Sequence, residues 1–184
     1  MSTFIELVKN RYSVRSYDGR AVERKAIGRC LEAARLAPSA CNAQPWHFVV
    51  ADENALVKRL AATALLSFSK LNRFAEQAPV IVALIGEKPN LTSSLGTVFK
   101  RKPLYLIDLG IAAEHFCLQA VEEGLGTCLL GWYDEKAARK ILGLPSGKRI
   151  YLLITVGYPL KKEIPEKKRK NLESISSWNR YGHS

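Results

Sequence analysis

The chain has 184 residues, enough for one domain with a substantial hydrophobic core. Its hydrophobic content of 47% and charged content of 24% are those of an ordinary globular protein and exclude a disordered or fibrous chain. The formal net charge of +11 allows nucleic acid, an anionic membrane or a phosphorylated small molecule as a partner, so the distribution of basic residues has to decide between them.

The first predicted elements are a short helix at residues 4–10 and an extended run at residues 11–17. Alternate side chains of an extended chain share a face. The two faces of this run therefore differ in chemistry, with Arg11, Ser13 and Arg15 on one side and Tyr12 and Val14 on the other. Two guanidinium groups around a hydroxyl suit a phosphate and a sugar, because arginine binds phosphate oxygens in a planar, bidentate manner. The alternative interpretation is a solvated edge strand.

An amphipathic helix is predicted at residues 22–37, and it leads into a loop of small and polar residues. Pro38 ends the helix, and Pro45 is expected to hold Gln44 in an extended conformation. The small side chains leave the backbone accessible, and the amides of Asn42 and Gln44 suit a flat heterocycle with alternating N–H and C=O edges. The loop is therefore a candidate binding loop, with an ordinary helix-to-strand connector as the alternative.

The middle of the chain alternates predicted strands and helices. We expect a strand at residues 47–51, a helix at 54–66, and a strand at 80–85 that is apolar on both faces and so belongs in the centre of a covered sheet. Residues 87–107 carry prolines, serines and a glycine. We interpret them as a mobile excursion, which in an enzyme would form a lid or a substrate wall.

Asp108 is expected to cap a helix that ends at Glu123. Few positions of this helix are polar, and helices that are apolar nearly all round are buried. In a domain of this size, we expect the sheet to cover one side of the helix and a second subunit to cover the other.

The glycines of residues 124–131 resemble part of a dinucleotide fingerprint, but they follow a helix and open a strand, which is the wrong order. We expect a strand that ends at Gly131, where the missing Cβ lets the backbone approach a ligand closely. Asp134 then caps a helix through Leu142, and residues 149–157 form the last long strand.

Several sites and partners are disfavoured by the sequence. No uninterrupted apolar run reaches the roughly 18 residues of a membrane span, and the N-terminus lacks the order of a secretory signal, so we expect a cytoplasmic protein with no membrane contact. The four cysteines form no close pair, so no metal centre or disulfide framework is expected. Cys41 in the loop has two interpretations, a redox thiol or a small packing residue. Basic residues are dispersed except at 161–170 and lack interleaved aromatic residues, which disfavours nucleic acid.

Four segments, taken in order, resemble the nitroreductase family of FMN-dependent oxidoreductases. They are Arg11-Tyr12-Ser13-Val14-Arg15, then Ala37-Pro38-Ser39-Ala40-Cys41-Asn42-Ala43-Gln44-Pro45-Trp46-His47-Phe48, then Gly124-Leu125-Gly126-Thr127-Cys128-Leu129-Leu130-Gly131, and then Gly157-Tyr158-Pro159. The resemblance covers nearly the whole chain, with residues 60–107 carrying no motif that aligns. It implies an α+β fold with a mixed, mainly antiparallel central sheet flanked by helices, in an intertwined homodimer with two FMN sites at the subunit interface.

The resemblance also implies roles for individual residues. One flavin segment consists of Arg11, Tyr12, Ser13 and Arg15. A second segment, which reaches the flavin from the other subunit, consists of Pro38, Ser39, Ala40 and Asn42, and we add the amide of Gln44 to it. Flavin N5 faces the backbone of Cys128, Leu129, Leu130 and Gly131, and the phosphate is bound by Lys167 and Arg169. Arg15 is expected to tune the flavin, and no side chain is given an acid–base role. Two positions depart from the family pattern: Tyr12 stands where a basic residue or histidine is frequent, and Leu130 where some members carry an acidic residue.

The expected molecule is therefore a single domain, residues 1–184, whose C-terminal extension at 160–184 packs on the partner subunit. Its expected activity is ping-pong hydride transfer, in which NADH or NADPH reduces FMN and a small electron-poor acceptor, a nitroaromatic or a quinone, is reduced next. The alternatives are a flavin-binding protein of the same fold with a different or no turnover, either flavin-handling or dehalogenase-like, and a basic nucleic-acid binder.

Overall fold

The computed structural model describes residues 3–65, 72–87, 103–161 and 163–182. Within these residues, strands form one sheet in the order β1-β2-β4-β3, where β1 is Trp46–Ala51, β2 is Val80–Gly86, β3 is Gly126–Leu130 and β4 is Arg149–Gly157. All neighbouring strands pair antiparallel. An isolated parallel bridge joins Ser13 to Thr127 on the outer edge of β3. The sheet is thus mainly antiparallel with a small parallel component, as expected.

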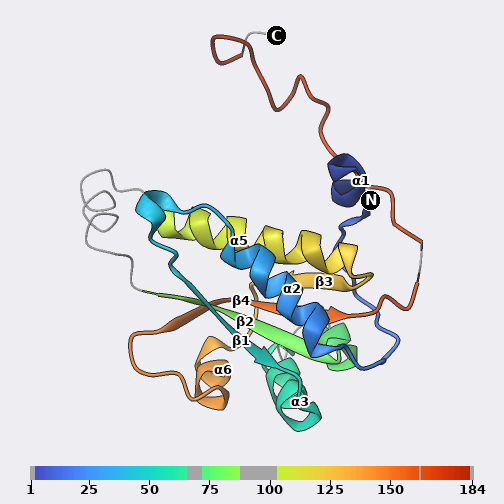
Figure 1. The fold of residues 1–184 in the computed structure, drawn as a ribbon, viewed down its shortest axis with the longest axis vertical. Coiled ribbons are helices and arrows are strands. Elements are labelled where there is room, and N and C mark those ends of the chain that lie inside the picture. The colour runs from blue at the N-terminus through green and yellow to red at the C-terminus, as the bar shows by residue number, and fades with distance from the viewer. Residues whose placement is uncertain (1–2, 66–71, 88–102, 162, 183–184) are drawn as a thin grey trace.

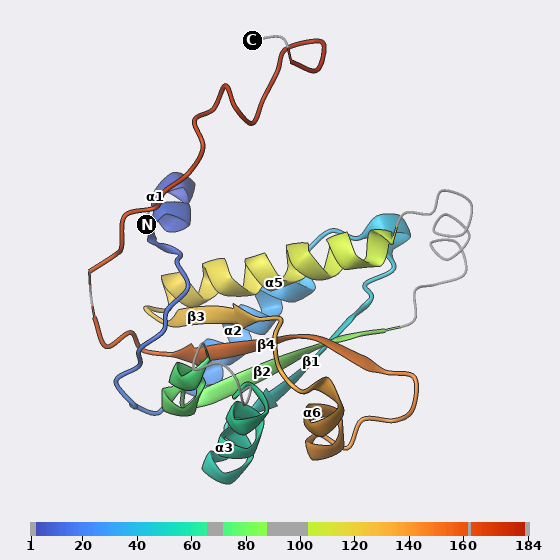
Figure 2. The same cartoon turned by 180° about the vertical axis from the view of Figure 1, so that it is seen from behind.

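Helices cover both faces of the sheet (Figure 1). One face carries α2 (Arg24–Arg35) and α5 (Leu104–Glu122), and the other carries α3 (Asn54–Thr63), α6 (Glu135–Ile141) and the short 3-10 helix η2 (Arg73–Gln77). The terminal helix α1 (Phe4–Asn10) lies near α5, and Figure 2 shows the C-terminal segment leaving the domain beside α1. The α+β prediction is confirmed.

The central strand β2 divides the core into two layers. Its residues from Val80 to Ile85 are all buried, as the fully apolar pattern predicts. Val80 and Val82 pack with α2 and α5, whereas Ile81 and the alternate residues after it pack with α3 and α6. This two-sided burial follows from the period of two in a strand.

Most predicted element boundaries agree with the structure. β4 occupies residues 149–157, and α6 starts after Asp134, whose carboxylate accepts a hydrogen bond of 3.0 Å from the Ala137 N–H. The helix predicted to reach Leu66 ends at Thr63, where the Thr63 hydroxyl donates to the Leu60 carbonyl oxygen. Leu66 itself lies outside the described residues.

The prediction that Asp108 caps α5 is wrong. The helix begins at Leu104 with Pro103 as its N-cap, and Asp108 lies inside it and is buried. Leucine, tyrosine and isoleucine at 104–107 continue the apolar helical pattern, and proline is tolerated where a helix needs no N–H donor. The predicted excursion therefore loses residues 104–107 to α5, while residues 88–102 lie outside the described part of the chain.

By length and composition alone, α5 is long and apolar enough to cross a membrane, with a mean hydropathy of 1.3 over an 18-residue window. The core helix of a soluble protein passes the same test. Charged residues interrupt the apolar run of α5, so this helix does not contradict the expectation that no uninterrupted apolar run reaches about 18 residues. Phe116 and Ala120 of α5 pack on the sheet in the core shared with α2. On its other side, Ile107 and Leu106 are exposed.

Candidate functional site

The extended run at residues 11–17 covers the outer edge of β3. The Val14 N–H donates to the Thr127 carbonyl oxygen at 2.9 Å, and Tyr17 forms a second isolated bridge with Pro159. The run therefore lies along the outer edge of the sheet. Because Thr127 precedes Cys128, this pairing brings two of the predicted flavin segments side by side.

Three basic side chains gather where the run leaves α1. The Lys167 ammonium donates to the Val8 carbonyl oxygen at 2.5 Å, which ties the C-terminal segment to α1. Desolvation, and then the charges of Arg11 and Arg169, lower the pKa of Lys167, so these three cations lie within electrostatic reach of one another. We call Arg11, Lys167 and Arg169 the basic cluster. The structure brings together the residues that sequence reasoning placed on a phosphate.

One acidic residue of α5 enters the basic cluster. Nε of Arg11 lies 3.0 Å from a carboxylate oxygen of Glu114. Nε is buried and has no hydrogen-bond partner within the described residues, so the contact with Glu114 is an ion pair without hydrogen-bond alignment. Three cations against one carboxylate leave an excess of positive charge and an unsatisfied donor. A phosphate dianion fits both.

Arg15 lies on the side of the run that faces away from α5. Its guanidinium carbon is 6.0 Å from the centre of the Phe74 ring in η2, and Nη1 donates to the Ser13 carbonyl oxygen at 3.4 Å. Burial raises the pKa of the Cys128 thiol, and the charge of Arg15 and a hydrogen bond with Ser13 oppose that shift. Arg15 and Ser13 are therefore close to β3, while Arg11 contacts α5. The guanidinium groups of Arg11 and Arg15 therefore have different neighbours.

The strand β3 presents alternating burial along the segment predicted to face flavin N5. Cys128 and Leu130 are buried in the core beneath the sheet, whereas Leu129 and Gly131 are exposed. A ligand beside this segment would meet the strand backbone and the small surface of Gly131. That is compatible with a backbone role for Cys128, Leu129, Leu130 and Gly131.

The loop between α2 and β1 is strained. Residues Ala40–Asn42 form the 3-10 helix η1, and three residues that are not glycine have left-handed φ values: 53° at Cys41, 51° at Asn42 and 45° at Gln44. Such values cost about 1–3 kcal/mol each and persist where surrounding structure holds them, often at binding sites. The strain favours a binding loop over a plain connector.

The predicted extended conformation of Gln44 is wrong. Its N–H donates to the Ser39 hydroxyl at 2.9 Å, and its side-chain amide donates to the Asn42 side-chain oxygen at 3.2 Å. These contacts pull Gln44 into the left-handed region, although Pro45 alone favours an extended residue before it. Asp108 completes the loop, because its carboxylate accepts a 3.2 Å hydrogen bond from the Ala40 N–H.

The loop and the basic cluster lie at different places on the chain. Figure 1 shows η1 at the N-terminal end of α5, whereas the run at 11–17 passes near the other end of that helix. One chain therefore does not bring Pro38, Ser39, Ala40, Asn42 and Gln44 to the cluster, which is the arrangement expected if they serve the site of a partner subunit.

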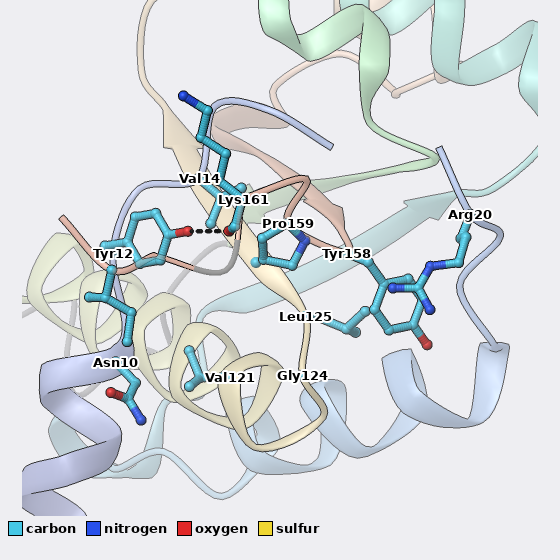
Figure 3. Close-up of a pocket in the computed structure, with 12 residues that line it drawn as sticks. Asn10, Tyr12, Val14, Arg20, Val121, Gly124, Leu125, Tyr158, Pro159 and Lys161 are labelled. Carbon is cyan, nitrogen blue, oxygen red and sulfur yellow. Dashed lines mark hydrogen bonds between the residues drawn. The ribbon is translucent and has the colours of Figure 1, made fainter. Parts of the chain in front are cut away.

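A pocket of about 290 Å³ lies on the opposite face of the run (Figure 3). Tyr12 and Val14 both line it, which confirms their predicted common face, whereas Arg11 and Arg15 do not share the single face predicted for them. The Tyr12 hydroxyl donates to the Lys161 carbonyl oxygen at 3.4 Å, and the Arg20 guanidinium stacks 4.1 Å from the Tyr158 ring centre. The side chain of Tyr12 therefore lines this pocket.

The thiols divide by exposure. Burial raises the pKa of Cys30 and of Cys117 to about 12, so both stay protonated at neutral pH. Cys41 is exposed on the strained loop.

Sequence reasoning missed Glu114 and the buried Tyr17–Thr155 pair. An acidic residue in the apolar middle of α5 was the available signal for Glu114. No local signal marks the Tyr17–Thr155 pair.

The model of the nitroreductase family matches residues 8–158. The chain belongs to the nitroreductase family. A protein of Archaeoglobus fulgidus is 30% identical to this chain over 86% of this chain and 87% of its own length. Its name assigns it, by inference, as an NADH dehydrogenase/NAD(P)H nitroreductase. Rat iodotyrosine deiodinase 1 is 24% identical over 94% of this chain and 68% of its own. An FMN-dependent nitroreductase structure from Clostridium difficile superposes with a TM-score of 0.78 at 24% identity, covering 97% of this chain and 100% of that one.

Proposed function

We propose that this nitroreductase-family protein is an FMN-dependent oxidoreductase that uses NADH or NADPH to reduce a small electron-poor acceptor of the nitroaromatic or quinone type. The basic cluster is the observation that carries the proposal, because three cations and an unsatisfied buried donor form a site for a phosphate. The names of the Archaeoglobus relative and of the Clostridium structure support the same activity.

In the proposed complex, Arg11, Lys167 and Arg169 bind the phosphate. Ser13 and Arg15 then contact the flavin from the run, and the backbone of residues 128–131 lies beside N5. The partner subunit supplies the loop of residues 38–44. When bound, FMN supplies two-electron chemistry that accepts hydride from the nicotinamide and delivers it to the acceptor in a second half-reaction.

The chain's own residues supply binding, orientation and charge. Arg15 places a fixed positive charge beside the proposed ring site, which stabilises negative charge more strongly than water would in a partly closed site. Hydride transfer itself requires no proton donor, so the proposal assigns no acid–base side chain. His115 is engaged within α5, where its Nδ1 lies 2.9 Å from the Ile111 carbonyl oxygen.

The proposed assembly is an obligate homodimer. The outer side of α5 and the neighbouring α1 form an apolar groove lined by Phe4, Leu7, Ile111 and Leu118. Beyond Lys170, the C-terminal segment exposes four large apolar side chains, at Leu172, Ile175, Trp178 and Tyr181. Apolar surface of this kind on a single chain is a sign of an interface. We place the C-terminal extension at residues 160–184 on the partner subunit, apart from Leu160 and Lys167, which donate to Ser16 and Val8 of their own chain. Residues 1–184 form one proposed domain. The four reduced cysteines support a cytoplasmic location.

Anaerobic spectroscopy tests the proposed activity. The purified protein is expected to be yellow and to bleach when NADH or NADPH is added. Colour is expected to return when a quinone or nitroaromatic follows without oxygen. A flavin-loaded protein that neither nicotinamide reduces would contradict the oxidoreductase and leave a flavin-binding protein.

A second candidate function is reductive dehalogenation at the same site. The similarity to rat iodotyrosine deiodinase 1 supports it as the alternative to a nitroaromatic or quinone acceptor. The discriminating experiment offers an iodinated phenol and a quinone to the reduced protein and measures iodide release. Iodide release at a rate comparable to quinone reduction would favour the dehalogenase.

A further inference from the structure

Two buried hydroxyl groups lie between the run at residues 11–17 and the strands behind it. The Tyr17 side-chain oxygen is 2.7 Å from Oγ1 of Thr155 in β4. Tyr17 is 5% exposed and Thr155 is fully buried. A buried polar pair of this kind stabilises a structure only when its hydrogen bonds are made.

Each hydroxyl also reaches a backbone carbonyl of a predicted flavin segment. The Tyr17 hydroxyl lies 3.1 Å from the Val14 carbonyl oxygen in the run, and Oγ1 of Thr155 lies 3.4 Å from the Cys128 carbonyl oxygen in β3. Each hydroxyl has one proton to donate. The Thr155 Oγ1 atom is 2.7 Å from the Tyr17 oxygen but 3.4 Å from the Cys128 carbonyl oxygen, which favours Thr155 as the donor to Tyr17. Tyr17 then donates its own proton to the Val14 carbonyl oxygen.

The chemistry of the pair is that of two neutral donors. Burial raises the pKa of Tyr17 well above its ordinary value, so its hydroxyl keeps its proton at any physiological pH. The ring of Tyr17 also needs the glycine at position 157, because a Cβ there would lie 2.9 Å from its Cδ1. The side chain is therefore fixed both by packing and by hydrogen bonds.

We infer that Tyr17 and Thr155 are positioning residues for the proposed flavin site, holding the run at residues 11–15 against β3 at one spacing. The inference rests on the proposed function. The backbone bond from Val14 to Thr127 sets the pairing of the two segments, and the hydroxyl pair anchors the neighbouring carbonyl from beneath. Ser13 and Arg15 on the run then face a ligand that also meets the β3 backbone.

Paired substitutions at Thr155 separate the hydroxyl from the packing. Thr155→Val keeps the volume and removes the hydroxyl, whereas Thr155→Ser keeps the hydroxyl and removes a methyl group. Tyr17→Phe removes the other hydroxyl. Thr63→Val is the matched control, because Thr63 is a buried threonine whose hydroxyl donates to a backbone carbonyl in α3, away from the run.

The first readout is the FMN dissociation constant of the apoprotein, measured by quenching of flavin fluorescence. We expect Tyr17→Phe and Thr155→Val each to raise it about tenfold, and Thr155→Ser and Thr63→Val to leave it within about twofold. The second readout needs no flavin. Amide exchange at Val14 is expected to be faster in Tyr17→Phe and Thr155→Val than in the two controls.

The outcomes separate this inference from the proposed function. Wild-type protein that binds no FMN would overturn both. If the wild type binds FMN tightly and Tyr17→Phe and Thr155→Val bind it equally tightly, the inference alone is overturned. An equal loss of FMN affinity in Thr155→Ser and Thr155→Val would also overturn the inference alone. If Tyr17→Phe fails to fold, the two Thr155 variants still decide the question.

Discussion

Glu114 of α5 lies inside the basic cluster, with a carboxylate oxygen 3.0 Å from Nε of Arg11. The side chains of this pair are 27% and 38% exposed, and pairs of that kind contribute at most about 1 kcal/mol to folding. A carboxylate beside a phosphate site repels the ligand at the same time. The ion pair therefore supports the fold only weakly, and its carboxylate opposes phosphate binding.

We predict that Glu114→Gln tightens FMN binding by about two- to fivefold, because it removes a negative charge beside the phosphate while keeping the shape of the side chain. A fluorescence titration of the apoprotein measures the change. Glu123→Gln is the control, since Glu123 ends the same helix but pairs with Arg29 of α2. Weaker binding in Glu114→Gln would mean that the carboxylate orients Arg11 for the phosphate.

Arg15 and Arg11 are expected to act on different properties of the flavin. Arg15→Ala removes a charge near the proposed ring, which costs the reduced, anionic flavin roughly 1.5–3 kcal/mol and the neutral oxidised flavin little. For a two-electron couple, that is about 30–65 mV towards more negative potential. Arg11→Ala is expected to weaken FMN binding in both redox states and to leave the potential nearly unchanged.

The midpoint potential and the FMN dissociation constant of both variants test this division. An unchanged potential in Arg15→Ala, with affinity lost in both redox states, would place Arg15 on the phosphate or the ribityl chain. Such a result agrees less well with its position near Phe74 and Cys128, on the side of the run away from Glu114.

The ion pair between Arg29 and Glu123 predicts part of the acid sensitivity. Hydrogen bonds from Arg29 hold the pKa of Glu123 below its ordinary value, and the pair joins α2 to α5. A carboxyl whose folded pKa is lowered stabilises the fold above its unfolded pKa of about 4.3, and that contribution is lost as the pH falls through the folded value. Thermal unfolding of wild type and Glu123→Gln is expected to differ by about 2–4 °C at pH 7.

The same comparison of melting temperatures at low pH tests whether the charge of Glu123 causes the difference. The difference in melting temperature is expected to close as the pH falls through the lowered pKa of Glu123, where the wild-type carboxyl becomes protonated. A difference that persists unchanged at about pH 3 would show that the Glu123→Gln substitution perturbs packing rather than removing a charge interaction.

The C-terminal segment is expected to hold the dimer together. Removing residues 171–184 deletes the four exposed apolar side chains but retains Lys167 and Arg169 of the basic cluster. Light scattering of the full chain is expected to give twice the mass of one 20.5 kDa chain, and the truncated chain a mixture that shifts towards monomer on dilution. A full-length monomer with flavin bound would contradict the dimer.

Local patterns predicted most of the fold. β4 and α6 were placed correctly because a strand period and an aspartate cap are encoded by neighbouring residues. Gln44 was misjudged because a contact outside its immediate neighbours, with the Ser39 hydroxyl, overrode the rule for a residue before proline. Asp108 was misjudged because the helix already begins at Leu104, where the apolar pattern continues after Pro103.

The site was predicted in part for the same reason. The resemblance placed Lys167 and Arg169 on the phosphate, the guanidinium chemistry of the run added Arg11, and the structure brings the three together. It carried no information on Glu114, which meets Arg11 from a distant part of the sequence, since this pairing depends on the packing of α1 and the run against α5. Tyr17 and Thr155 are 138 residues apart and meet only when the run is placed on β3.

The central claim is that the basic cluster binds the phosphate of FMN, and a comparison of FMN with riboflavin tests it most directly. The two ligands share the ring and the ribityl chain and differ by the phosphate. Charged hydrogen bonds contribute about 1.5–3 kcal/mol each, so two or more of them predict that apoprotein binds FMN at least about 100-fold more tightly than riboflavin. Arg11→Ala is expected to reduce this difference by about tenfold or more. Equal affinity for FMN and riboflavin, or a preference that Arg11→Ala leaves intact, would contradict the claim.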